Sequence, residues 1–152
     1  MTDQKPWYFE ERAEQLAIML LTRLEGVQVS RMGADPGVDL LVTIDSQHSA
    51  GRLFGVEVKA TKKMSSLVNS NGILKRDLAT RLEKATKHYT FPVGVLIVEV
   101  ISDAARFGWI LKPEAGQAIY TGNIHTQVAT KEVMRRSLEE VKRWYQRRAA
   151  GT

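Results

Sequence analysis

The stretch Leu53-Phe-Gly-Val-Glu-Val-Lys-Ala60 has the branched, apolar composition of a β-strand, yet it carries two charges at its centre. Because side chains alternate across a strand, Val56 and Val58 share one face, and Glu57 and Lys59 share the other, about 7 Å apart. Burying a carboxylate and an ammonium is costly unless they are paired or perform a task. The stretch therefore predicts a core strand whose charged face forms either an internal ion pair or part of a functional site.

A second apolar stretch, 38–44, has a similar anomaly near its start, where Asp39 follows an expected turn at 33–37. If 38–44 and 53–60 are hairpin partners, the carboxylates of Asp39 and Glu57 face each other across the ladder. Two facing carboxylates repel each other unless a positive charge lies between them. A hard divalent cation such as Mg²⁺ meets this need, since it prefers oxygen ligands.

We therefore expect Asp39 and Glu57 to bind Mg²⁺, with Mn²⁺ as a substitute. The main-chain carbonyl of Val58 is the expected third ligand. Lys59 is then expected to orient the attacking water and to stabilise negative charge on a phosphate. These residue types together are suited to metal-assisted chemistry at a phosphate group.

The first predicted helix, 9–25, brings a further acid toward this site. Glu10 and Glu14 continue an apolar stripe that runs at helical spacing to Leu24. Glu14 is the better placed of the two acids to reach a metal ion, directly or through a water. We therefore expect Glu14 to complete the acidic cluster.

Hydrophobic periodicity assigns the remaining elements. It predicts helices at 9–25, 77–89 and 130–148 and strands at 27–32, 38–44, 53–60, 93–101 and 107–111. Asp77 and Thr130 are expected to cap the second and third helices. Residues 61–75 are expected to form a mobile loop beside the site, and 113–129 to hold short strands.

The order of these elements defines the expected fold class, which is α/β. Strands joined by short links form an antiparallel meander, and a helix between two strands permits a crossover to a parallel neighbour. We expect one domain over 1–152 with its core at about 9–112. Its mixed central sheet has helices on its faces in three layers, in the order α-β-β-β-α-β, followed by an added strand and a basic C-terminal helix.

Composition narrows the class of protein. With 43% hydrophobic and 26% charged residues, the chain has the balance of a soluble globular protein. Because it has no cysteine, disulfides, thiolate metal sites and cysteine nucleophiles are excluded. No apolar run could span a bilayer, and the start lacks the pattern of a signal peptide, so we expect a cytoplasmic protein without membrane contact.

The residues described above, in this order, resemble the PD-(D/E)xK nuclease superfamily. The resemblance rests on Glu14 in the first helix, on Asp35-Pro-Gly-Val-Asp39 before an apolar strand, and on Gly55-Val-Glu-Val-Lys-Ala-Thr61. It covers roughly 9–101. The pattern looks most like the restriction-endonuclease-like branch that contains Mrr-type and Holliday-junction-resolving enzymes and an uncharacterised group of small bacterial proteins.

The resemblance implies a restriction-endonuclease-like core and metal-dependent cleavage, with Asp39 and Glu57 as ligands and Lys59 as the catalytic lysine. This sequence departs from the pattern in two places. Val38 precedes Asp39 where the superfamily motif has proline, and the second helix lacks a clear glutamine on its site-facing stripe. The second departure leaves open which residues of that helix touch substrate.

Basic residues indicate how a polyanion would be held. The net charge is +5, and the segment from Lys131 to the C-terminus carries most of it. That segment is either a solvated helix face or a phosphate-contacting surface. The candidate nucleic-acid contacts are Lys62, Lys63, Lys84, Lys87, Arg135 and Arg143. For Lys62 and Lys63, which follow the site strand, keeping a loop soluble is an equal alternative.

The functional expectation is a Mg²⁺-dependent endonuclease that acts on DNA as a homodimer. Contacts confined to the backbone predict binding that tolerates sequence and is sensitive to salt. One alternative is a catalytically silent module on the same fold that binds nucleic acid or recruits a partner. Another is an interaction subunit whose acidic pocket is structural. The roles of two further acids stay undecided. Asp35 either forms the turn or supports the site, and Glu99 either lies at a sheet end or supports the site.

Overall fold

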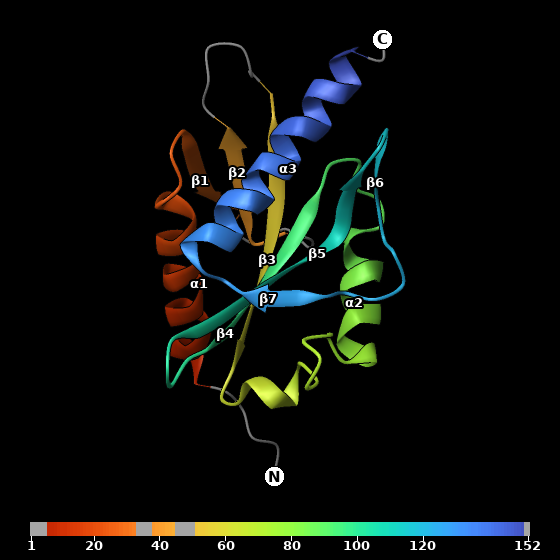
Figure 1. The fold of residues 1–152 in the computed structure, drawn as a ribbon. Helices are drawn as coiled ribbons and strands as arrows, with labels where there is room; N and C mark the ends of the chain where they lie inside the picture. Colours follow the sequence, from red (N-terminus) through yellow and green to blue (C-terminus); the bar gives the residue numbers. More distant parts are fainter. Residues whose placement is uncertain (1–5, 33–37, 45–50, 151–152) are drawn as a thin grey trace.

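The computed structural model describes residues 6–32, 38–44 and 51–150 (Figure 1). The expected turn at 33–37, with Asp35 in it, and most of the loop at 45–52 lie outside these residues. In chain order the elements are α1 (Trp7–Thr22), β1 (Val27–Arg31), β2 (Leu40–Ile44), β3 (Leu53–Thr61), the 3-10 helix η1 (Met64–Ser66), α2 (Arg76–Thr86), β4 (Val93–Glu99), β5 (Ala104–Glu114), β6 (Gln117–Ile119), β7 (Thr126–Val128) and α3 (Lys131–Ala150). The predicted order is confirmed, and the predicted boundaries hold to within three residues.

One mixed sheet forms the centre of the α/β fold. Its order is β1-β2-β3-β4-β5-β6, and β7 pairs with β5. β1, β2 and β3 form the predicted antiparallel meander. The connection through α2 then makes β4 parallel to β3, as the intervening helix predicted.

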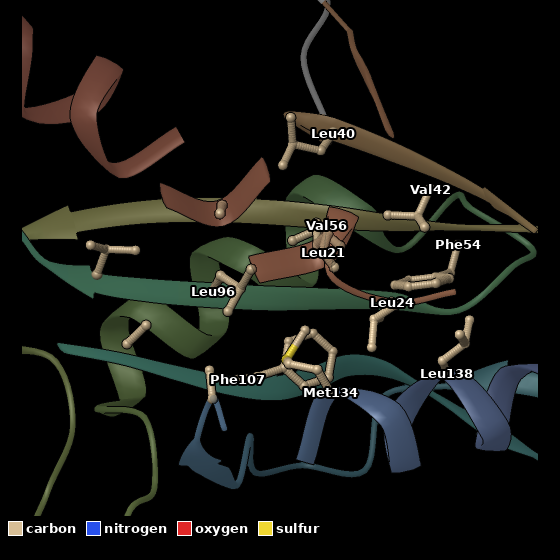
Figure 2. Close-up of a cluster of buried hydrophobic side chains, with 14 of the residues drawn as sticks. Leu21, Leu24, Leu40, Val42, Phe54, Val56, Leu96, Phe107, Met134 and Leu138 are labelled. Carbon is tan, nitrogen blue, oxygen red and sulfur yellow. The ribbon is translucent and has the colours of Figure 1, made fainter. Parts of the chain in front are cut away.

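Helices cover both faces of this sheet. α1 and α3 pack on one face, where apolar residues of β2 to β5 meet both helices (Figure 2). The cluster drawn there includes Leu21, Leu24, Leu40, Val42, Phe54, Val56, Leu96, Phe107, Met134 and Leu138. α2 packs on the opposite face against Val93, Val95 and Ile97. No helix of the described segments is both long and apolar enough to cross a membrane.

The two capping predictions have different outcomes. Thr130 caps α3 as expected, since its Oγ1 accepts a hydrogen bond from the N–H of Val133 at 3.1 Å. Asp77 does not cap α2, which begins after Lys75 without a side-chain cap, and Asp77 lies in its first turn. There its charge favours the positive end of the helix dipole without accepting a capping bond.

The segment 61–75, expected to be a mobile loop, contains some regular structure. η1 lies in this segment, Val68 pairs with Leu74, and Ile73 pairs with His125. The N–H of Leu74 donates to the carbonyl of Ile124 at 2.9 Å. The segment is therefore hydrogen-bonded to a distant part of the chain. Local periodicity does not reveal such contacts.

Candidate active site

The site lies where β3 continues past its neighbour β2. β2 pairs with β3 from Leu53 to Val56, whereas β3 runs on to Thr61. Among the described residues, no strand pairs with this edge of β3 beyond that point. Asp39 stands just before β2, and its Oδ2 accepts a hydrogen bond from the N–H of Val58 at 2.7 Å. A side chain thus takes the place of the missing strand partner.

The register brings the two predicted carboxylates together. Leu40 pairs with Val56, so the adjacent residues Asp39 and Glu57 are neighbours across the two strands. Glu57 is 5% exposed, and its Oε2 lies 4.0 Å from Nζ of Lys59. Its other oxygen, Oε1, is buried without a hydrogen-bond partner in the part of the chain that the structure describes.

Burial raises the pKa of all three predicted acids. It raises the pKa of Glu57 to about 7, with the negative charge of Asp39 as the second cause, while Lys59 opposes the shift. Burial likewise raises the pKa of Asp39, against the hydrogen bond from Val58 and the charge of Lys59. Burial also raises the pKa of Glu14, which the nearby Arg31 partly offsets. A cation bound nearby would stabilise the charged form of these carboxylates.

A cavity of about 310 Å³ opens beside this edge of β3. α1, β3, α2 and the segment before α2 all contribute to its wall, together with Asp39. The lining residues are Glu10, Ala13, Glu14, Asp39, Val58, Lys59, Ala60, Leu67, Leu78 and Arg81. The predicted residues Asp39, Lys59 and Glu14 therefore line one cavity. Glu57 does not line it, but it contacts Lys59, which does.

Glu14 lies in the cavity wall but already has an ionic partner. Its Oε1 is 3.4 Å from a guanidinium nitrogen of Arg31, which also contacts Glu11 at 3.1 Å. Glu10 lines the same cavity one helical turn away. The acids Glu10 and Glu14 of α1 thus line the same cavity as Asp39, and Glu14 forms an ion pair with Arg31.

The donor set fits a hard divalent cation held partly by its waters and substrate. Within residues 6–32, 38–44 and 51–150, no three acidic or histidine side chains gather closely enough to bind a metal ion on their own. Asp39 and Glu57 supply two carboxylates, and one oxygen of Glu57 lacks any partner among the described residues. One or two carboxylates are the usual protein share of a Mg²⁺ site that also contacts phosphate.

The predicted basic contacts are dispersed. Lys62 and Lys63 are exposed directly after β3, and Nζ of Lys62 lies 5.9 Å from the centre of the Phe9 ring. The exposed residues Lys84 and Lys87, near the end of α2, and Arg143 of α3 do not line the cavity.

Arg135 lies in a separate groove between the end of α1 and α3. It forms an ion pair with Glu132 at 2.6 Å. The groove, of about 510 Å³, also contains Lys131, Lys142 and Arg23. Three basic residues of α3 therefore line a groove separate from the cavity at the β3 edge, and Glu25 and Glu139 line it with them.

Sequence reasoning missed Arg81, which lines the cavity from α2. The basic residues expected there were Lys84 and Lys87. Spacing could have identified Arg81, because it follows Leu78 by three residues and Leu78 belongs to the apolar stripe that faces the sheet. Arg81 is the basic residue that α2 contributes to the cavity wall.

The acid Glu99 has a structural position at the end of β4. Its Oε2 accepts a hydrogen bond from the N–H of Met64 at 2.7 Å, and its Oε1 accepts one from the hydroxyl of Ser102 at 2.6 Å. These bonds lower its pKa, chiefly the bond from Ser102. Glu99 therefore lies at a sheet end and fastens η1, which is one of the two positions its sequence allowed.

Compared with protein-family models, with curated proteins and with solved structures, the chain has no match in any of the three.

Proposed function

We propose that this protein is a Mg²⁺-dependent endonuclease with a restriction-endonuclease-like core of the PD-(D/E)xK type, and that its substrate is DNA. One observation carries the proposal: the buried Oε1 of Glu57 has no hydrogen-bond partner among the described residues, yet it lies beside Asp39 and Lys59 at an open strand edge. A purely structural carboxylate in this position would leave a buried polar atom unsatisfied at a cost in stability.

Asp39 and Glu57 are the residues that would hold the cation, and Val58 is the candidate for a carbonyl ligand. When bound, a divalent cation polarises a phosphate oxygen and makes water a better nucleophile at neutral pH. The hydrogen bond from the N–H of Val58 fixes the Asp39 carboxylate before any ligand arrives. This preorganisation favours binding, because the Asp39 side chain does not have to be ordered first.

Hydrolysis joins a water oxygen to phosphorus and breaks one P–O ester bond. The water loses a proton, and the departing ester oxygen gains one. Lys59, whose side chain is 40% exposed, lines the cavity where the phosphate would lie. Its ammonium can hold the attacking water and offset the charge that grows on the phosphate oxygens. Arg81, in the same cavity wall, can bind a second phosphate oxygen.

A homodimer and a cytoplasmic location remain predictions from the sequence. Two copies would present one site to each strand of a duplex. Light scattering on the purified chain measures the mass directly, and a monomer at all concentrations would contradict the dimer.

A nucleic-acid-binding or partner-recruiting module without cleavage is the second candidate. The groove beside α3 favours it, since Lys131, Arg135 and Lys142 line that groove with Glu25 and Glu139 and without Asp39 or Glu57. Such a module would bind nucleic acid equally well when Lys59 or Asp39 is replaced, and it would show no turnover.

The deciding experiment is metal-dependent cleavage of a labelled panel. The panel holds linear duplex, supercoiled plasmid, a four-way junction, single-stranded DNA and RNA, each with Mg²⁺, Mn²⁺ or EDTA. Lys59→Ala is compared with Lys112→Ala. Lys112 on β5 is 50% exposed and 3.5 Å from Glu114, so it is a matched lysine outside the cavity. Cleavage of DNA that needs metal and is lost only in Lys59→Ala supports the proposal, and absence of all cleavage contradicts it.

A further inference from the structure

Two aromatic side chains stand in solvent at the start of α1. Trp7 is 81% exposed and Tyr8 is 52% exposed. Trp144, by contrast, is 3% exposed, and its Nε1 donates to the carbonyl of Gln117 at 3.0 Å. Two neighbouring aromatic side chains left in water form a surface suited to binding something flat and apolar.

Helical spacing places Trp7 on the same face as the acids of the site. Trp7, Glu10 and Glu14 are separated by three and four residues, which is one face of an α-helix. With a rise of about 1.5 Å per residue, Trp7 lies about 5 Å along the axis from Glu10 and about 11 Å from Glu14. Both acids line the cavity. The exposed indole therefore lies on the helix face that borders the cavity, one turn before Glu10.

The two exposed rings are held by the core. Tyr8 lies edge to face with Trp7, with ring centres 6.1 Å apart, and also edge to face with Phe9, at 5.3 Å. Phe9 packs against the apolar cluster under α1. Lys62, at the end of β3, places its ammonium 5.9 Å from the Phe9 ring centre. Trp7 and Tyr8 thus form an exposed aromatic platform, and the ammonium of Lys62 lies beyond it, next to Phe9.

We propose that this aromatic platform stacks the unpaired bases of a single-stranded DNA segment that leads into the active site. The inference rests on the proposed function and deepens it, because it names the structure of the substrate. Bases in a duplex are stacked on each other and paired at their edges, so their faces are not accessible to an exposed indole. Unpaired bases stack readily on aromatic side chains, whatever their sequence, while a nearby ammonium pairs with the backbone.

The test is fluorescence anisotropy with a labelled twelve-nucleotide thymidine oligomer and with a duplex of the same length, in EDTA so that no cleavage occurs. Trp7→Ala is compared with Trp7→Phe, which retains a stacking ring, and with Met19→Ala. Met19 is a 46% exposed apolar residue of the same helix. We expect Trp7→Ala to weaken binding of the single strand about tenfold, with a smaller change for the duplex, while Trp7→Phe and Met19→Ala remain near wild type.

Three results would overturn the inference. One is equal affinity of Trp7→Ala and Met19→Ala for the single strand. Another is an equal loss on the duplex, and the third is tighter binding of a uridine RNA oligomer than of the thymidine oligomer. Because the readout is binding in EDTA, it is independent of turnover. Selective weakening in Trp7→Ala without any cleavage by the wild type would support the platform and refute the nuclease. Cleavage with no effect of Trp7→Ala would do the reverse.

Discussion

The carboxylate of Asp39 accepts the main-chain N–H of Val58 at 2.7 Å, at the point where the ladder between β2 and β3 stops. This hydrogen bond joins a residue that precedes one strand to the middle of the next. It fixes Asp39 beside Glu57 and Lys59, the residues on either side of Val58. The site is thus a consequence of strand register. A substitution at Asp39 can keep its hydrogen bond to Val58 while removing its negative charge.

Asp39→Asn is such a substitution. The amide oxygen can still accept the N–H of Val58, so the free energy of unfolding should stay within about 1 kcal/mol of wild type. The lost negative charge should reduce cleavage by at least about 100-fold. Asp39→Ala removes the acceptor as well and should lower stability by a further ~1–3 kcal/mol. Chemical denaturation together with a cleavage assay checks both, and an active Asp39→Asn would refute the role of this carboxylate.

Glu57 should make the stability depend on pH in metal-free buffer. Its pKa is raised by burial from an ordinary value of 4.5 to about 7. The folded state therefore binds the proton more tightly than the unfolded state. The resulting stabilisation is complete below pH 4.5 and is lost as pH rises through 7, by about 3 kcal/mol in total.

Glu57→Gln should remove that dependence. The difference in free energy of unfolding between wild type and Glu57→Gln, measured by urea denaturation in EDTA from pH 5 to pH 8, should move in favour of the variant as pH rises. Adding Mg²⁺ at pH 8 should raise the free energy of unfolding of the wild-type protein and leave that of Glu57→Gln unchanged. A pH-independent difference would show that burial does not raise the pKa of Glu57.

Arg81 and Lys84 provide a matched pair on one helix. Arg81 lines the cavity and Lys84, one turn later, does not. Replacing Arg81 with alanine should reduce kcat/KM for DNA cleavage about tenfold, because a charged contact to phosphate is lost. Lys84→Ala should change it less than twofold. Equal losses in the two variants would indicate that α2 contributes only a diffuse positive field.

Tyr145 connects α3 to the start of the site strand. Its hydroxyl donates to the carbonyl of Leu53 at 2.6 Å and accepts the N–H of the same residue at 3.1 Å. Tyr145→Phe leaves both backbone groups without this partner and should destabilise the fold by about 1–3 kcal/mol. Tyr120→Phe is the control, since the Tyr120 hydroxyl forms an exposed bond to Gly122 and its loss should cost less than about 0.5 kcal/mol. Thermal denaturation compares the two, and equal effects would refute this role of Tyr145.

The strands could be read from the sequence because their patterns are local. Alternation in 53–60 placed Glu57 and Lys59 on one face, and the short links on either side of 38–44 predicted the antiparallel pairing that brings Asp39 to Glu57. The helical spacing of Glu10 and Glu14 placed both acids toward the site in the same way. These features depend on the period of side chains along one element.

Other features depend on contacts between distant segments. The N–H of Thr126 donates to the carbonyl of Gly72 at 2.8 Å, and this contact helps fasten the segment that looked like a free loop. A Cβ on Gly72 would lie 2.9 Å from the carbonyl oxygen of Thr126, so glycine permits the approach. In α2, Thr86 is buried and Ala85 is exposed. The Thr86 hydroxyl donates to the carbonyl of Leu82 at 2.8 Å, so this polar group is satisfied inside the core, which apolar periodicity alone does not reveal.

The role of the metal site is tested most directly by the initial rate of supercoiled-plasmid nicking as a function of Mg²⁺ concentration. Wild type, Asp39→Asn, Lys59→Ala and the control Lys112→Ala are measured side by side. Wild type and Lys112→Ala should nick the plasmid with a saturable dependence on Mg²⁺. Asp39→Asn and Lys59→Ala should be at least about 100-fold slower at every concentration. Nicking that persists in EDTA, or that survives in both site variants, would contradict this role of the metal site.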